Sequence, residues 1–156
     1  MNSVLHVSLI FLHVVLAAAW FGLGLALPAL ARSAMADGGA PVAALGRRVL
    51  LIMGVALVGF YVVAVGNFLT GGSVRVYGWP YHTAITLGLL LIGVHFLLLQ
   101  PAWGQLVKGL GTPEADVARG RLGMAIGIGH TLWLVMLVLM YLPRFGVGMP
   151  RTLGLG

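Results

Sequence analysis

Four long stretches of the chain are apolar almost throughout, and they cover residues 4–30, 49–70, 81–100 and 122–142. A helix needs about 20 apolar residues to cross the hydrocarbon core of a bilayer, which is about 30 Å thick. Each stretch meets that length. The pattern therefore predicts an all-α fold, in which residues 1–156 form one integral membrane domain, a four-helix bundle in contact with the lipid bilayer.

Prolines lie where several of these helices are expected to begin or end. Pro80 precedes the third stretch, and the first turn of a helix tolerates a residue that has no N–H group. Pro101 and Pro143 are expected to close the third and fourth helices, because proline inside a helix removes a hydrogen bond and clashes with the preceding turn. Pro28 falls late in the first stretch and is expected to kink or end that helix.

The first stretch does not have the pattern of a cleavable signal peptide. No basic residue precedes it, and its apolar run is longer than the roughly 7–15 residues of such peptides, so we expect a retained helix.

The longest segment outside the spans covers residues 102–120. Its apolar side chains favour a short helix lying at the membrane surface; they are Trp103, Leu106, Val107 and Leu110.

Composition agrees with a membrane protein. Hydrophobic residues make up 60% of the chain and charged residues 8%, and the mean hydropathy is +1.06. Soluble domains carry about 25% charged residues, so a soluble globular domain is excluded. A net charge of +6 would first suggest a nucleic-acid partner. Because the basic residues are spread over short loops outside the spans, they indicate membrane topology instead, and we expect no nucleic-acid partner.

The distribution of basic residues predicts the orientation of the chain. Three lie on the side of the termini and of the second loop, namely Arg75, Arg144 and Arg151, and six lie on the other side, namely Arg32, Arg47, Arg48, Lys108, Arg119 and Arg121. Loops rich in Lys and Arg remain in the cytoplasm. We therefore expect a multi-pass protein of a bacterial-type inner (plasma) membrane, with both termini on the non-cytoplasmic side.

Few side chains remain for chemistry. The chain has no cysteine, which excludes disulfides, thiolate metal sites and cysteine nucleophiles. Its three carboxylates, Asp37, Glu114 and Asp116, lie outside the spans, which excludes a carboxylate proton relay or a carboxylate-bridged di-metal centre within the membrane. Five histidines and seven methionines are left.

The histidines fall into two groups by expected depth. With a rise of 1.5 Å per residue, His13 lies about 13 Å below the outer surface, His130 about 18 Å and His95 about 20 Å. These three form a mid-membrane set drawn from three helices. His6 and His82 both lie about 3 Å deep and form an outer set. Ionisable groups inside a membrane mark functional sites, although a single histidine can also simply hydrogen-bond a neighbouring helix.

Neutral imidazole is a good axial ligand for haem iron, and both imidazole and the thioether of methionine bind copper. We expect one or two haem b groups, with His13, His95 and His130 as the metal ligands and a second site at His6 and His82. Copper is the alternative cofactor.

The 24 glycines indicate close helix packing or room for a flat cofactor. The GxxxG pair Gly123 and Gly127 permits either a homo-oligomer or packing within one chain.

The first span reads LHVVLAAAWFGLGLALPAL over residues 12–30. With His13, the Trp20-Phe21 pair, Gly22, Gly24 and Pro28, it resembles the opening helix of HemJ-type membrane protoporphyrinogen oxidases and of the related CopD-like four-helix proteins. Arg47-Arg48, Tyr77-Gly78-Trp79 and His95 are similar to that group as well. The HemJ-type resemblance implies that His13 is linked to haem b and that the protein oxidises a porphyrinogen. The CopD-like resemblance implies copper uptake.

Four functions therefore stand as expectations. The first is a haem b-binding redox protein, a possible membrane oxidoreductase that transfers electrons, with quinol or another electron-transfer partner. The others are a HemJ-like protoporphyrinogen oxidase, a CopD-like copper transport protein, and a structural subunit of a larger membrane complex. His130 lies outside the HemJ-type pattern and is our candidate for a second axial ligand.

Overall fold

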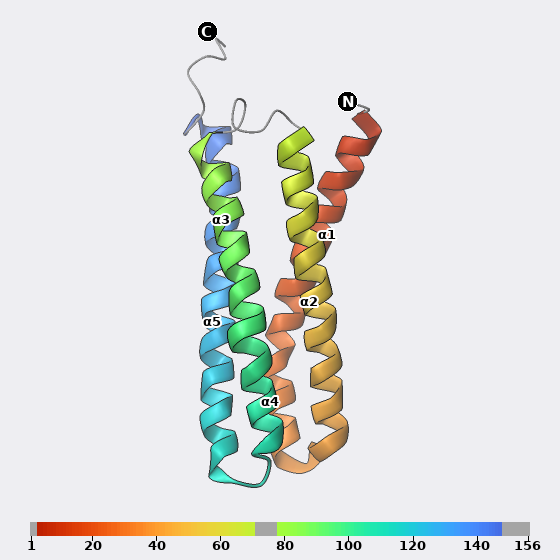
Figure 1. Ribbon diagram of the computed structural model, residues 1–156, viewed down its shortest axis with the longest axis vertical. Coiled ribbons are helices and arrows are strands. Elements are labelled where there is room, and N and C mark those ends of the chain that lie inside the picture. The colour runs from red at the N-terminus through yellow and green to blue at the C-terminus, as the bar shows by residue number, and fades with distance from the viewer. Residues whose placement is uncertain (1–2, 71–77, 148–156) are drawn as a thin grey trace.

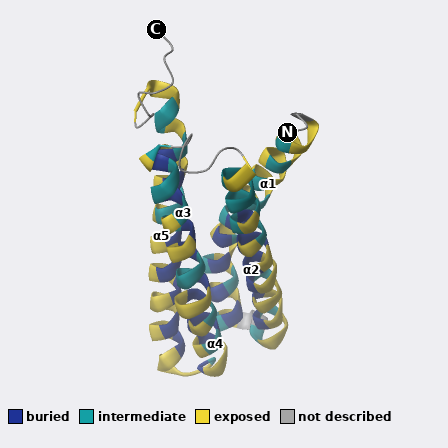
Figure 2. Ribbon diagram, turned by 45° about the horizontal axis from the view of Figure 1, so that its top comes forward, coloured by how far each residue is buried: buried dark blue, intermediate teal, exposed yellow. Residues whose placement is uncertain are grey.

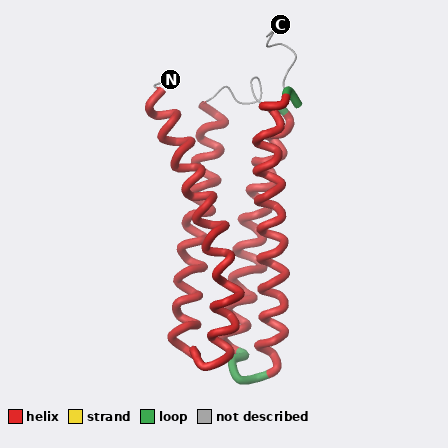
Figure 3. The backbone as a smooth tube through the Cα atoms, turned by 180° about the vertical axis from the view of Figure 1, so that it is seen from behind, coloured by secondary structure: helices red, strands yellow, loops and turns green. Residues whose placement is uncertain are grey.

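The structure, a computed structural model, describes residues 3–70 and 78–147. In this part of the chain helices dominate and no strand occurs, which confirms the all-α expectation. The elements are α1 (Ser3–Ser33), η1 (Ala34–Gly38), α2 (Gly39–Thr70), α3 (Trp79–Gly93), η3 (Val94–Leu99), α4 (Gln100–Lys108), α5 (Pro113–Tyr141) and η4 (Leu142–Phe145). Figure 1 shows the long helices running up and down, and Figure 3 shows from behind the short loop that joins α4 to α5.

The helices form an antiparallel bundle in which α1 packs against α2 and α5, and α3 packs against the same two helices. Helices α1 and α3 are therefore diagonal neighbours. We call the end where α1 joins α2 and α4 joins α5 the loop end, and the end where α1 begins and α5 finishes the terminal end (Figure 1). At the loop end the chain reverses at Ala36, whose φ and ψ of −81° and −109° are not helical.

Four helices of the described chain are long and apolar enough to cross a membrane: Val4–Ala36, Gly39–Thr70, Trp79–Lys108 and Pro113–Phe145. They contain the four predicted spans, and each extends beyond its prediction on at least one side. Buried residues lie on the inner faces of the helices and exposed residues on the outer faces (Figure 2). Many of the exposed residues are large and apolar. Phe11, for example, is 70% exposed although it is apolar, which is consistent with contact to lipid.

The structure contradicts an end of the helix at two prolines, Pro28 and Pro101, while a kink at Pro28 stays a prediction. The first helix continues through Pro28 to Ser33. The third helix does not end at Pro101 but continues to Lys108. Just before Pro101 the helix widens into a π-helical segment, η3, where the N–H of Gln100 donates to the carbonyl of His95 five residues earlier. This wider turn places Pro101 in the first turn of α4, where its missing N–H group and its ring are tolerated.

The continued helix also corrects the expectation of a surface helix after Pro101. Trp103 and Leu106 of α4 are 2% and 0% exposed and belong to the hydrophobic core. Helix α4 packs against α5 and α2 rather than lying at the membrane surface. The expected end near Pro143 is confirmed, since α5 ends at Tyr141 and a single 3₁₀ turn follows it.

Candidate cofactor site

Large rings are packed onto glycines of the facing helices, and this contact determines where the histidines can lie. The indole of Trp103 occupies the position that a Cβ atom on Gly46 would take, and its Nε1 donates to the carbonyl of Ala43 at 3.3 Å. In the same way, the ring of Trp20 would lie 2.8 Å from a Cβ on Gly129. We call such glycines seat glycines, because each leaves space for a ring from another helix.

His95 is presented by the π-helical segment η3 and is completely buried. Its Nε2 lies 3.0 Å from the position of a Cβ on Gly54 of α2, and the ring lies beside the carbonyl of Leu50. The side-chain nitrogen of Gln100 lies 3.4 Å from the same Nε2. The other ring nitrogen, Nδ1, is buried and has no hydrogen-bond partner in the described part of the chain.

His130 lies on α5 and faces α1. Its Nε2 lies 2.7 Å from the position of a Cβ on Gly24, and the methyl group of Met53 lies 3.4 Å from that same position. The ring centroid of Phe21 is 4.4 Å from that of His130. This Nε2 is buried without a hydrogen-bond partner among the described residues. The methyl end of Met53 and an unpartnered imidazole nitrogen therefore both border Gly24.

His13 of α1 stacks on Phe60 of α2, with the ring centroids 4.5 Å apart and the planes at 30°. Phe60 follows Gly54, the seat of His95, by six positions, which is about 9 Å along a helix. His13 therefore lies closer to the terminal end than His95 does. Its Nδ1 is also buried without a hydrogen-bond partner in the described ranges.

The three mid-membrane histidines are thus not gathered at one point. Across residues 3–70 and 78–147, no group of three or more His, Cys, Asp or Glu side chains is placed to hold one metal ion. Of the three, His95 and His130 lie closest to the same height along the bundle axis. His130 packs beside Met53 of α2, and His95 packs on Gly54, the next residue of the same helix. Both rings point from the α3–α5 side of the bundle toward the α1–α2 side.

The two outer histidines lie on diagonal helices, His6 on α1 and His82 on α3. The His82 ring meets the ring of Phe68 edge-on, with centroids 5.1 Å apart. The Nδ1 atom of His6 is buried without a hydrogen-bond partner among the described residues. Each outer histidine therefore has its own surroundings, and a shared outer site remains a prediction.

The sequence reasoning missed the residues that position the mid-membrane histidines. The sequence places Gly24 in the first-span resemblance and Gly54 among the glycines of the second span, but it predicts no ring contact at either and no role for Gln100. Gln100 carried a usable signal, since it is an amide in an apolar stretch, five positions after His95. The seat glycines carried no such signal, because a glycine that faces a ring and a glycine that faces lipid are the same residue in a sequence.

No protein-family model, no curated protein and no solved structure matches this chain. The site must therefore be judged on its own chemistry. The mid-membrane part of the site offers three imidazoles in an apolar interior, each with one buried ring nitrogen that no described group satisfies, and His6 has such a nitrogen as well. The site also offers one neighbouring thioether.

Proposed function

We propose that the protein is an integral membrane haem b-binding protein that transfers electrons, with a quinol as the candidate redox partner. The observation that carries the proposal is the set of buried, unpartnered ring nitrogens on His13, His95 and His130 in the described chain. A buried polar atom without a partner costs about 1–3 kcal/mol. A metal-centred group that binds these nitrogens removes that cost.

His95 and His130 are the preferred axial ligands. They lie at a similar height along the bundle axis, His95 on η3 and His130 on α5. His95 packs on a glycine of α2, and His130 packs on a glycine of α1. The two imidazole rings themselves occupy these seats, because a side chain larger than glycine there would displace them. When bound, the haem supplies the one-electron chemistry. The chain supplies imidazole ligands and a dry, apolar surrounding. Gln100 contacts Nε2 of His95, and with its amide oxygen accepting an Nε2–H it leaves the lone pair of the ring on the unpartnered Nδ1.

A visible spectrum of the purified protein tests this proposal. After haem-replete expression and purification in mild detergent, we expect the α band of a b-type cytochrome in the reduced-minus-oxidised spectrum. His95→Ala and His130→Ala are expected to lose most of that band. Thr131→Ala is the matched control, because Thr131 is next to His130 and its hydroxyl donates to the carbonyl of Gly127 in its own helix. Absence of the band in the unmodified protein contradicts haem binding.

His13 allows the ligand assignment to be tested separately from haem binding. If His95→Ala and His130→Ala both keep the band while His13→Ala loses it, haem binding stands and our choice of ligands is wrong. His6→Ala and His82→Ala test the second haem. A loss of half the haem per protein in both variants indicates two groups, and unchanged haem content indicates one.

A CopD-like copper protein is the second candidate, and one contact favours it. The methyl group of Met53 and Nε2 of His130 approach the same point beside Gly24, and a thioether with an imidazole suits copper, Cu(I) in particular. This function predicts copper in the purified protein and no Soret band. Met53→Leu is expected to lower the copper content with little effect on folding, because leucine has a similar volume.

A further inference from the structure

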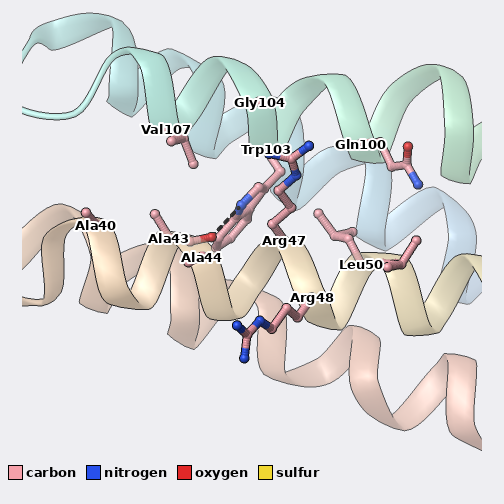
Figure 4. A pocket seen from close by; sticks show the side chains of 11 residues that line it. Ala40, Ala43, Ala44, Arg47, Arg48, Leu50, Gln100, Trp103, Gly104 and Val107 are labelled. Carbon is pink, nitrogen blue, oxygen red and sulfur yellow. Dashed lines mark hydrogen bonds between the residues drawn. The ribbon is translucent and has the colours of Figure 1, made fainter.

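A groove of about 810 Å³ opens between α2 and α4 near the loop end of the bundle. Its walls include Ala44, Arg47, Leu50, Gln100, Trp103 and Gly104. Figure 4 shows the Arg47 side chain reaching between the two helices toward Trp103, while Arg48 extends to the opposite side of α2. Apart from Arg47, Arg48 and Gln100, the groove is lined by apolar residues.

The charge of Arg47 has no counterpart in the groove. No carboxylate lines it. Of the two described acidic side chains at the start of α5, Asp116 pairs with Arg119 at 3.2 Å, and Glu114 lies in the same first turn. Arg47 makes no ion pair with a described acidic residue. A guanidinium at the edge of an apolar groove is therefore available to an anion from outside the chain.

The groove is also open along its length. Nothing lies within 4 Å of the position that a Cβ on Gly104 would take, so the wall formed by α4 leaves space there. Both walls belong to helices that are long and apolar enough to cross a membrane, so a lipid beside the bundle can reach the groove. Arg47 and Arg48 both line the groove, and Arg47 is the one that reaches between the two helices (Figure 4). An apolar floor beside this guanidinium matches a molecule with an acyl chain and an anionic head.

We propose that this groove binds one anionic phospholipid, with its phosphate on the guanidinium of Arg47 and an acyl chain along the apolar floor. Guanidinium groups bind phosphate oxygens in a bidentate manner, and basic pockets between transmembrane helices bind anionic head groups. Nothing in the groove selects a choline group. The face of Trp103 is buried, and its N–H is used by Ala43, so no exposed aromatic cage remains.

Native mass spectrometry of the full-length protein in detergent tests the proposal. The probes are phosphatidylglycerol and phosphatidylcholine with identical acyl chains, added at equal concentration. We expect at least about tenfold more bound phosphatidylglycerol. Arg47→Gln is expected to abolish that preference. Lys108→Gln is the matched control: it removes the same charge from the last turn of α4 but lies outside the groove. Equal binding of the two lipids overturns the proposal.

A steric variant keeps the test decisive if Arg47→Gln folds poorly. Gly104→Leu fills the groove and leaves Arg47 in place, so it is expected to reduce lipid binding several-fold while the helical circular dichroism is unchanged. Retention of phosphatidylglycerol by Gly104→Leu contradicts the groove as the binding site. A thermal shift that inorganic phosphate alone reproduces shows an anion site without lipid specificity, which also overturns the proposal. Neither result depends on haem binding.

Discussion

Glycine has two different roles at the residue scale. Seat glycines, such as Gly24, Gly46 and Gly54, face a ring from another helix. Open glycines, such as Gly123 and Gly127, have nothing within 4 Å of the position of a Cβ. The GxxxG pair therefore does not serve packing within the described chain, and its role in a homo-oligomer stays a prediction.

The seat at Gly46 gives the sharpest stability prediction. In Gly46→Ala the new methyl group overlaps the buried ring of Trp103, and overpacking of this kind costs about 1–3 kcal/mol of unfolding free energy. The measurement is thermal or denaturant unfolding in detergent. Gly127→Ala is the control, since its methyl group meets open space. Its free energy of unfolding is expected to be no lower than that of the unmodified protein and up to about 1 kcal/mol higher, because alanine favours the helix over glycine. Equal stability of both variants would contradict the packing of Trp103 on α2.

At the scale of elements, the third membrane-spanning helix is the most informative. It is continuous from α3 through η3 to α4, and the π-helical turn both tolerates Pro101 and carries His95. π-helical turns occur frequently at functional sites. Gln100 and His95 are five positions apart in the sequence, and the turn brings the Gln100 side chain to the Nε2 atom of His95.

Leu106 and Val107 test whether α4 is buried in the bundle. Leu106 is 0% exposed, whereas Val107 is 36% exposed. Leu106→Ala is expected to lower the free energy of unfolding by about 2–5 kcal/mol, the usual cost of truncating a buried leucine. Val107→Ala is expected to change it by less than about 1 kcal/mol. If the segment lay on the membrane surface, the two variants would have similarly small effects.

The sequence was sufficient for the fold class and for the positions of four spans, because the number of residues needed to cross a bilayer is fixed by its thickness. It was not sufficient for the continuation past Pro101, since a single-residue rule for proline takes no account of a π-helical turn in the preceding residues. It identified the histidines by their chemistry. It did not identify their neighbours, because Gly24 and Met53 meet His130 only through contacts between distant parts of the chain.

At the scale of the whole molecule, charge separates the two ends of the bundle. The loop end carries Arg32, Arg47, Arg48, Lys108, Arg119 and Arg121, while the described part of the terminal end carries Arg144. This asymmetry supports the expectation that the loop end faces the cytoplasm. It also concentrates positive charge where the groove between α2 and α4 opens.

The orientation can be measured directly because the chain contains no cysteine. We expect a membrane-impermeant maleimide to label Phe145→Cys in spheroplasts or intact cells with a permeable outer layer. Glu114→Cys is expected to react only after the membrane is permeabilised. Both side chains are exposed, so accessibility to the reagent depends on the side of the membrane. The reverse pattern contradicts the orientation.

The seat glycines have a consequence for how this sequence can change over time. A seat filled by a ring accepts no side chain, so substitutions at Gly24, Gly46, Gly54, Gly88 and Gly129 should be removed by selection. Substitutions at Gly22, Gly66, Gly93, Gly123 and Gly127 meet open space and should accumulate unless another molecule covers that surface. Glycines of the two kinds should therefore be substituted at different rates, although the residue is the same. The slowly changing glycines would mark where the four helices contact one another.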